Sequence, residues 1–227
     1  MSEMRSKRAL VTGASSGIGQ AIAVRFGEEG AYVAVGGRDE ASSVVDAAVA
    51  AMGGLDVVVN NAGIDANEWH DVADFPIDVF DEIMAVNNRG PFLIAKFSIP
   101  HLLAAGGGSM LHISSVCAAT VWSGDSAYGI SKAALNMLSD HIAVEYGARG
   151  IVSNTLMPGV FRTPLHEGVM EGMNDGRAFE RTLLSRHPIG RFGAISEIAE
   201  SAVFLCSGAA PFLTGANIPI DGGYSRL

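Results

Sequence analysis

The chain has 227 residues, of which 48% are hydrophobic and 17% charged, with 28 glycines and 8 prolines. This mixture is typical of a globular α/β protein with a large core, and it excludes disordered, collagen-like and coiled-coil chains. A net charge of −9 argues against a broad basic surface for nucleic acid or anionic lipid, and no apolar run is long enough for a membrane span or signal segment. We therefore expect a cytoplasmic protein with no nucleic-acid or membrane partner.

Short runs typical of buried strands alternate along the chain with longer stretches of helical period. The expected strands are, in chain order, Ala9–Val11, Tyr32–Val35, Asp56–Val59, Met110–Ile113, Val152–Leu156 and Asn217–Ile220. The expected helices are Gly19–Glu29, Ala41–Met52, Pro76–Asn87, Gly90–Ala104, Ala127–Tyr146 and Ser196–Leu205. This alternation predicts a single domain over residues 1–227, with a doubly wound parallel sheet covered by helices on both faces.

A glycine-rich turn follows the first expected strand and opens directly into a helix. It reads Thr12-Gly13-Ala14-Ser15-Ser16-Gly17-Ile18-Gly19. Glycine lets the backbone turn tightly and approach a pyrophosphate, while the free N–H groups at a helix start face the anion. The turn therefore predicts a dinucleotide site rather than a tight turn without a ligand. Its candidate binding residues are Gly13, Ser15, Ser16, Gly17, Ile18 and Gly19.

The end of the second strand bears on the choice of dinucleotide. An acid there hydrogen-bonds the ribose 2′-OH of NAD, whereas a base binds the 2′-phosphate of NADP. Gly37 stands where the acid is expected, and Arg38 offers a guanidinium fork for a phosphate. The sequence therefore favours NADP over NAD. A shift of one residue would instead place Asp39 near the ribose, so NAD remains the alternative.

A tyrosine and a lysine four residues apart form the candidate catalytic pair. Tyr128 and Lys132 fall on one face of an expected helix. A free tyrosine, with a pKa near 10, is a poor general acid–base at neutral pH. We expect the Lys132 ammonium to lower the pKa of Tyr128. Ser115 follows an expected strand and is placed to hydrogen-bond the same substrate oxygen.

Residues 163–190 interrupt the alternation with a charged, glycine-containing stretch of short, weakly helical pieces. Its position beside the last strands predicts a substrate lid over a cleft, with a solvated surface excursion as the alternative. The histidines show no ligand spacing, and Cys117 and Cys206 form no C-x-x-C pair, so we expect no metal and no disulfide framework. Trp122 is a candidate pocket wall, and His112 a structural histidine on a buried strand.

Taken together, the motifs resemble the short-chain dehydrogenase/reductase family. The matching residues are Thr12-Gly13-x-x-x-Gly17-x-Gly19, Asn60-Asn61-Ala62-Gly63, Ser115, Tyr128-x-x-x-Lys132, Pro158-Gly159 with Thr163, Thr214-Gly215 and Asp221-Gly222-Gly223. Their order and spacing match over nearly the whole chain. The resemblance implies a Rossmann-like fold and an NAD(P)-dependent oxidoreductase that interconverts a secondary alcohol and a ketone. It also implies a homotetramer built partly through the helices Gly90–Ala104 and Ala127–Tyr146.

The same resemblance implies a role for each matching residue. Tyr128 is the general acid–base, Lys132 lowers its pKa and holds the nicotinamide ribose, and Ser115 orients the substrate oxygen. Asn87 positions a water that links Lys132 to solvent. The other matches line the cofactor, near its adenosine ribose or its nicotinamide carboxamide. They are Asn61, Ala62, Gly63, Pro158, Gly159, Val160 and Thr163.

The chain departs from the family pattern after the second expected strand. Only 19 residues separate Val35 from Leu55, where family members usually hold a helix, a third strand and another helix. Nineteen residues build one useful helix, Ala41–Met52. We therefore expect the third strand and its adenine-contacting aspartate to be absent, the second strand to form the sheet edge, and the cofactor to bind weakly. A stretch missing from the printed sequence would look the same, and the Arg38 assignment depends on which strand precedes it.

Two other functions account for part of the sequence. A cofactor-sensing NAD(P)-binding protein without turnover fits the shortened nucleotide half, but the catalytic set is intact. A methyltransferase that uses S-adenosylmethionine fits the glycine turn but leaves the Tyr–Lys pair unexplained. Neither the substrate nor the direction of reaction follows from the sequence.

Overall fold

The computed structural model describes residues 4–37, 40–66, 69–171 and 175–226 of the chain. Within these residues, six parallel strands form one sheet in the order β2-β1-β3-β4-β5-β6. The strands are β1 (Arg8–Thr12), β2 (Tyr32–Gly36), β3 (Val57–Asn60), β4 (Gly108–Ile113), β5 (Ile151–Pro158) and β6 (Asn217–Ile220). The sheet confirms the predicted doubly wound, Rossmann-like fold.

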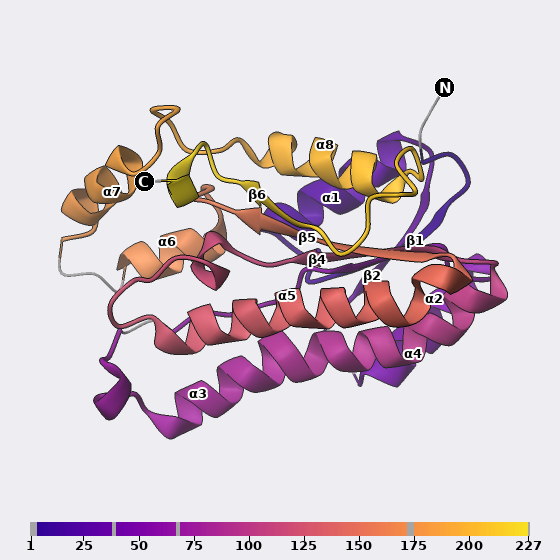
Figure 1. Cartoon of the computed structure of the whole chain (residues 1–227), viewed down its shortest axis with the longest axis horizontal. Helices are drawn as coiled ribbons and strands as arrows, with labels where there is room; N and C mark the ends of the chain where they lie inside the picture. Colours follow the sequence, from indigo (N-terminus) through magenta and orange to yellow (C-terminus); the bar gives the residue numbers. More distant parts are fainter. Residues whose placement is uncertain (1–3, 38–39, 67–68, 172–174, 227) are drawn as a thin grey trace.

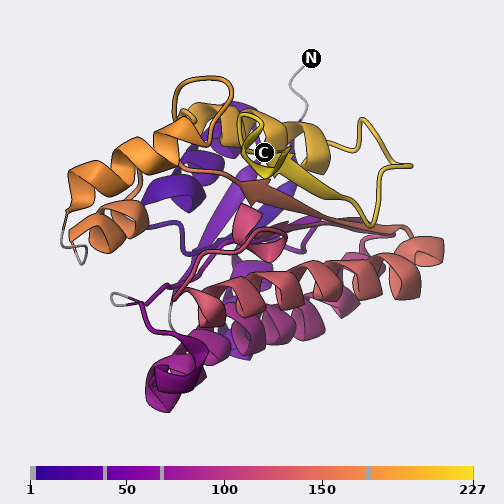
Figure 2. The same ribbon diagram turned by 60° about the vertical axis from the view of Figure 1, so that its left-hand side comes forward.

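Helices cover both faces of this sheet (Figures 1 and 2). They are α1 (Gly17–Glu28), α2 (Ala41–Met52), α3 (Ile77–Met84), α4 (Gly90–Ala104), α5 (Ser126–Tyr146), α6 (Pro164–Glu171), α7 (Gly176–Ser185) and α8 (Ile195–Cys206). Helices α1 and α8 pack together on one face, and α2, α4 and α5 lie on the other. Figure 2 shows α6 and α7 beyond the end of the sheet, on the side of α8. Short 3-10 turns occur at Val72–Asp74, Val116–Ala118, Gly147–Arg149 and Tyr224–Arg226.

The central strands are apolar on both sides because helices cover both faces. All four residues of β3 are buried, and its three valines project alternately into two separate cores. Val57 and Val59 join the core beneath α1 and α8, whereas Val58 joins the core beneath α2 and α4. The continuous apolar runs in the sequence therefore predicted these strands well.

The position of α2 follows from the order of the strands. The connection from β2 to β3 passes β1 and runs in the opposite direction to the connection from β1 to β2. Because such crossovers are right-handed, the two connecting helices must lie on opposite faces of the sheet. Accordingly, Val45 and Ala48 of α2 pack into the core that α4 shares, away from α1.

Strand β2 forms one edge of the sheet, as the short connection predicted. Between β2 and β3 the described residues contain α2 and no strand. Tyr32 and Val35 on this edge strand are 63% and 58% exposed. Val35 lies on the same face of the sheet as Val33, which packs in the core beneath α1. Among the described residues, no helix lies beyond α1 on this face to shield Val35.

The helix expected over Pro76–Asn87 differs from the structure at its end. α3 stops at Met84, and Ala85–Arg89 forms a π-helical turn that leads directly into α4. Such turns widen a helix by one residue and are often found at functional sites. Here the turn contains Asn87, one of the candidate site residues.

Candidate active site

A cavity of about 950 Å³ lies at the carboxyl ends of the parallel strands. Ligands of open α/β sheets bind at this edge, because the loops after neighbouring strands meet there. Residues that follow β1, β3, β4 and β5 form one wall, and residues of α6 and α7 form another. The segment predicted as a lid, residues 163–190, which we call the lid segment, lies against the cavity in its described part through Thr163, Leu165, Phe179 and Leu183.

The glycine turn lines one end of this cavity. Gly13 and Gly17 have positive φ angles of 63° and 58°, which favour glycine. A β-carbon on Gly13 would lie 2.7 Å from the α-carbon of Ala62, so a side chain there would displace the backbone. Helix α1 begins at Gly17 with no side-chain cap from Ser16 and no acid in its first turn. Its first N–H groups are therefore free to bind a phosphate, and the cradle fits a dinucleotide pyrophosphate.

Asn61 braces the glycine turn from the neighbouring strand. Its side-chain amide donates to the backbone oxygens of Thr12 and Gly13, each at 3.0 Å. The hydroxyl of Thr12 accepts hydrogen bonds from the backbone N–H groups of Asn61 and Ala62, at 3.1 and 3.2 Å. These contacts couple the ends of β1 and β3, and they place Ala62 and Gly63 beside the turn.

Most of the predicted cofactor residues line the same cavity. Those on its surface are Gly13, Ser15, Ser16, Gly17, Ile18, Asn61, Ala62, Gly63, Tyr128, Lys132, Pro158, Gly159, Val160 and Thr163. Gly19 lies behind the surface, where a β-carbon would approach the Asn61 amide to 2.3 Å. Arg38 and the competing Asp39 fall outside the described residues.

Three candidate catalytic side chains converge at the other end of the cavity. Ser115 follows β4, and its hydroxyl, which accepts from the backbone N–H of Cys117 at 3.1 Å, lies close enough to the Tyr128 phenol to influence its ionisation. Tyr128 and Lys132 lie one turn apart on α5, and both are buried. The amine of Lys132 donates to the backbone oxygen of Ile113 at 3.0 Å and lies 5.3 Å from the centre of the Tyr128 ring.

Asn87 stands behind this group rather than on the cavity surface. From the π-helical turn, its side-chain amide donates to the backbone oxygen of Ile64 and to the hydroxyl of Ser131, at 2.8 and 2.9 Å. Its side-chain oxygen accepts from the backbone N–H of Ile64 at 2.8 Å. Asn87 therefore joins α5 to the segment after β3.

Burial dominates the ionisation of the tyrosine and the lysine. It raises the pKa of Tyr128 well above its ordinary value, and the carboxylates of Asp65 and Asp125 add to this effect. Burial also lowers the pKa of Lys132 to about 8. The expected lowering of the tyrosine pKa by lysine is therefore not found in the protein alone. The lysine does not lower the tyrosine pKa because its amine is hydrogen-bonded to the backbone oxygen of Ile113 and faces the tyrosine ring.

A pair of aspartates lies beside the tyrosine, and the sequence analysis missed it. Asp65 follows β3 and Asp125 immediately precedes α5; both line the cavity, and their carboxyl groups lie close enough to influence each other's ionisation. Burial raises the pKa of both carboxyl groups, and the charge of Asp65 raises the pKa of Asp125 further. Ionising both carboxyls together is therefore unfavourable. The acid three residues before Tyr128 was the available signal.

Aromatic rings from distant parts of the chain close the substrate end. Trp69 and Trp122 lie 6.2 Å apart, and the ring of Phe179 on α7 lies 5.2 and 5.4 Å from them. Tyr224, near the carboxyl end, accepts a hydrogen bond from the Trp122 indole. Trp122 was an expected pocket wall, whereas the other three carry no sequence pattern that marks them.

His112 lies inside the sheet, where both of its ring nitrogens contact polar side chains. These partners are the amide of Asn60 at 3.2 Å and the hydroxyl of Ser153 at 3.3 Å. Burial lowers the pKa of His112 to about 4, which keeps the ring neutral. In the described ranges, no group of three or more His, Cys, Asp or Glu side chains is arranged to hold a metal ion. Of the helices described, none combines the length and apolar character that a membrane span needs.

Two family profiles match the chain and together cover nearly all of it. Residues 7–42 match a profile described as short chain dehydrogenase, and residues 35–225 match one described as enoyl-(acyl carrier protein) reductase. The two matches meet at the connection after β2, where the chain is short. This junction agrees with the absence of a strand between β2 and α2 in the described residues.

Curated and solved relatives match over nearly their full length. The 2-(R)-hydroxypropyl-CoM dehydrogenase of Xanthobacter autotrophicus is 32% identical over 253 aligned residues, covering 98% of this chain and 100% of that protein. Because this alignment is longer than the 227-residue chain, the relative contains internal residues that this chain lacks.

Two solved structures share the fold closely. The aldohexose dehydrogenase of Thermoplasma acidophilum is 31% identical with a TM-score of 0.90, over 100% of this chain and 96% of that one. The gluconate 5-dehydrogenase of Burkholderia cenocepacia, solved with NADP and tartrate, is 29% identical with a TM-score of 0.90, over 100% of this chain and 98% of that one. On these matches, and on the fold and motifs described above, the chain belongs to the short-chain dehydrogenase/reductase family of oxidoreductases.

Proposed function

We propose that this protein is an NADP-dependent oxidoreductase that interconverts a secondary alcohol and a ketone, with Tyr128 as its general acid–base. The observation that carries the proposal is one continuous cavity, with the glycine turn at one end and Ser115, Tyr128 and Lys132 at the other. A bound nicotinamide cofactor supplies or accepts the hydride at this site. The protein contributes position, hydrogen bonds and a proton.

The residues that hold the cofactor follow from the cavity walls. The N-terminus of α1 and the turn Gly13–Gly17 receive the pyrophosphate, and Pro158, Gly159 and Thr163 flank the nicotinamide. Arg38 is proposed as the ligand of the 2′-phosphate. The NADP in the structure of the related gluconate 5-dehydrogenase agrees with this choice. Asp39 with NAD is the competing assignment.

The proton belongs to the tyrosine hydroxyl. Because burial raises the pKa of Tyr128, the resting phenol stays protonated and is ready to donate to a carbonyl oxygen that Ser115 holds. The phenolate that this donation leaves is stabilised by the nearby Lys132 ammonium, which is the main form of this group at neutral pH because its pKa is about 8. The amine of Lys132 donates to the backbone carbonyl of Ile113. Asn87 is proposed to position a water that links Lys132 to solvent. This arrangement favours reduction at neutral pH.

The substrate end combines aromatic rings with a buried acidic pair. Trp69, Trp122 and Phe179 present apolar faces, which suit a cyclic or hydrocarbon body. Asp65 and Asp125 accept hydrogen bonds and repel anions. We therefore assign a neutral or cationic alcohol or ketone as substrate, in contrast to a compound with a carboxylate near its reacting carbon.

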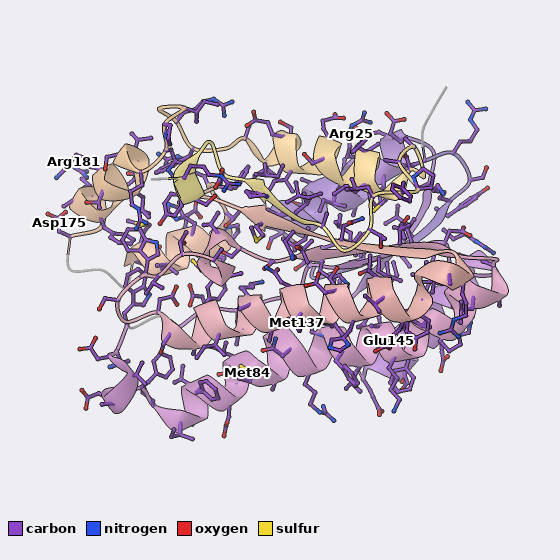
Figure 3. All side chains as sticks on the ribbon, viewed as in Figure 1. Arg25, Met84, Met137, Glu145, Asp175 and Arg181 are labelled. Carbon is purple, nitrogen blue, oxygen red and sulfur yellow. The ribbon has the colours of Figure 1, made fainter. Side chains whose placement is uncertain are left out.

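A second copy of the chain is proposed to pack against α4 and α5 in a homotetramer. Ile130, Met137 and Val144 form an apolar stripe at intervals of one heptad on α5 and are 51%, 56% and 85% exposed. Figure 3 labels Met137 within this stripe, on the same helix as Glu145. Exposed apolar stripes of this kind mark association surfaces.

A cofactor sensor without turnover is the second candidate, because the edge position of β2 leaves the adenosine end of the cavity with less cover. Fluorescence titration with NADPH and with NADH, followed by a screen of neutral ketones, separates the two. The enzyme is expected to bind NADPH more tightly and to reduce a ketone, and Tyr128→Phe abolishes turnover while cofactor binding is retained. Binding without turnover on any ketone or alcohol would favour the sensor.

A further inference from the structure

His187 connects the lid segment to the part of the site that flanks the nicotinamide. It lies two residues after the end of α7 and is 3% exposed. One ring nitrogen, Nδ1, contacts the backbone oxygen of Leu183 on α7 at 2.7 Å. The other, Nε2, contacts the backbone N–H of Val160 at 3.3 Å. The imidazole thus bridges two segments of the cavity wall.

The chemistry of these partners selects one form of the ring. A carbonyl oxygen can only accept, so Nδ1 carries the hydrogen that bonds Leu183. A backbone N–H can only donate, so Nε2 presents its lone pair to Val160. The neutral Nδ1–H tautomer satisfies both contacts at once. A residue of the same shape without both functions would lose at least one of them.

The segment around His187 is also clamped to the cofactor wall and to the carboxyl end of the chain. The backbone N–H of Gly193 donates to the oxygen of Val160 at 3.0 Å, and that of Ile189 donates to the oxygen of Gly222 at 3.1 Å. The His187 ring lies between Phe192 and Tyr224, with ring centres 5.6 and 5.1 Å away. Residues 187–193, which we call the strap, are therefore held against Val160 and against the carboxyl end of the chain.

On its other side, the strap continues into the lid. Leu183 is 6% exposed and lines the cavity, and Phe179 on the same helix contacts both tryptophans. Gly159 fits directly against the imidazole, since a β-carbon there would lie 3.1 Å from Nε2. The imidazole is therefore in contact with Gly159 and Val160 on one side and with the last turn of α7 on the other.

We propose that His187 is a positioning residue that couples the nicotinamide-flanking segment to lid helix α7, so that occupation of the cofactor site sets the position of the substrate wall. This inference rests on the proposed function for the identity of the cofactor. It assigns His187 no contact with the reacting atoms. Its effect is carried by the two backbone hydrogen bonds and the fixed strap.

Two substitutions separate the two hydrogen bonds. Asparagine places its amide near the position of Nδ1, so His187→Asn keeps the contact to Leu183 and loses the contact to Val160. Glutamine reaches the position of Nε2, so His187→Gln keeps the contact to Val160 and loses the contact to Leu183. His112→Asn is the matched control, because His112 is also buried with both ring nitrogens hydrogen-bonded, but it lies in the sheet away from the lid.

The principal readout is amide hydrogen exchange of residues 176–185, with and without NADPH. In the unaltered protein, NADPH slows this exchange. In His187→Gln, NADPH binds within about twofold of the unaltered affinity, but α7 exchanges fast whether or not NADPH is present. In His187→Asn, α7 is protected at rest but does not respond to NADPH, whose affinity falls about fivefold for one lost backbone bond. His112→Asn keeps the full response even where its thermal stability falls.

Tryptophan emission without cofactor gives a second measurement, because the two tryptophans, Trp69 and Trp122, both contact Phe179 of α7. His187→Gln should shift this emission, and His187→Asn should leave it unchanged. If both variants keep the NADPH-dependent protection of α7, or if NADPH binds the unaltered protein without slowing exchange there, the coupling is overturned while the proposed function stands. Failure of the unaltered protein to bind NADPH overturns both.

Discussion

Gly63 lies directly against Lys132: a β-carbon built on the glycine would be 3.2 Å from the lysine amine and 3.3 Å from the side-chain oxygen of Asn87. The φ angle of Gly63 is not positive, so its backbone conformation does not require glycine. Glycine is favoured at this position because a side chain would collide with Lys132 and Asn87. The absence of a side chain at position 63 therefore keeps the amine in its place beside the tyrosine.

We expect Gly63→Ala to lower kcat about tenfold, because the added methyl displaces the Lys132 amine by a few tenths of an ångström and misaligns the site. Thermal stability should change little, since the added methyl meets the ends of side chains rather than backbone. Steady-state kinetics with NADPH and a reducible ketone measure the effect. Gly147→Ala, where a β-carbon meets nothing within 4 Å, is the control. Equal kinetics for both variants would contradict the packing argument.

The pH dependence of the two reaction directions should differ. Reduction needs the protonated phenol, and burial raises the pKa of Tyr128 well above its ordinary value, so the reduction rate should not rise with pH. Oxidation needs the phenolate, so its rate should increase towards alkaline pH for as long as the protein stays folded. Initial rates in both directions across a pH series test this. A reduction rate that climbs with pH would show that the tyrosine is already ionised near neutrality.

The carboxyl pair should make the protein less stable as pH rises. Burial and the charge of Asp65 raise the pKa of Asp125 well above its ordinary value of 3.8, so the folded state binds more protons than the unfolded state as pH rises above that value. The free energy of unfolding therefore falls as pH rises through this window. Asp125→Asn removes this pH-dependent loss. The change in unfolding free energy caused by Asp125→Asn should therefore be more favourable at pH 8.5 than at pH 4, by about 1–3 kcal/mol.

Urea unfolding of the unaltered protein and of Asp125→Asn at both pH values gives the comparison. Asp46→Asn, a matched change on the exposed surface of α2, serves as the control. If Asp125→Asn destabilised the protein equally at both pH values, the carboxyl would be ionised in the folded state.

The adenosine half of the cofactor should contribute less to binding than in a relative that contains the internal residues this chain lacks. Val35 and Gly37 line the adenosine end of the cavity, and both are exposed. We expect the ratio of dissociation constants for reduced nicotinamide mononucleotide and NADPH to be at least about tenfold smaller here than in the Xanthobacter relative, since roughly 1.4 kcal/mol of contact is missing. Fluorescence titration of both proteins with both ligands measures it, and equal ratios would refute the expectation.

The proposed assembly surface can be broken without touching the site. Met137→Glu places a charge in the middle of the apolar stripe on α5, where the side chain is 56% exposed. We expect sedimentation to report a smaller species than for the unaltered protein. Tyr32→Glu, on the exposed edge strand β2, should leave the assembly intact. A tetramer that persists in Met137→Glu would place the contact elsewhere.

The sequence predicted those elements whose residues carry their own pattern. Continuous valines identified β3, and Tyr128 and Lys132 fell on one helical face as expected. The π-helical turn at Ala85–Arg89 could not be predicted, because it depends on the bonds of Asn87 to Ile64 and Ser131. These partners come from other elements.

The electrostatics of the site escaped the sequence for a similar reason. A lysine near a tyrosine predicted a lowered tyrosine pKa, but the depth of burial and the carboxylates of Asp65 and Asp125 act in the opposite direction. Asp65 and Asp125 come from different loops, and no sequence pattern in either loop indicates that the two carboxyl groups meet. Tyr224 reaches Trp122 only because β6 lies beside β5 and returns the chain to the substrate end.

The place of β2 at the sheet edge has a consequence for how this architecture can grow or shrink. A strand beyond β2 would pair with one neighbour only, so a helix and strand can be added or lost there as a unit without breaking any other pairing. The connection that follows β2 is thus a natural insertion point. A short foreign segment placed there should extend the sheet or hang free, while the five inner pairings and the catalytic end keep their geometry.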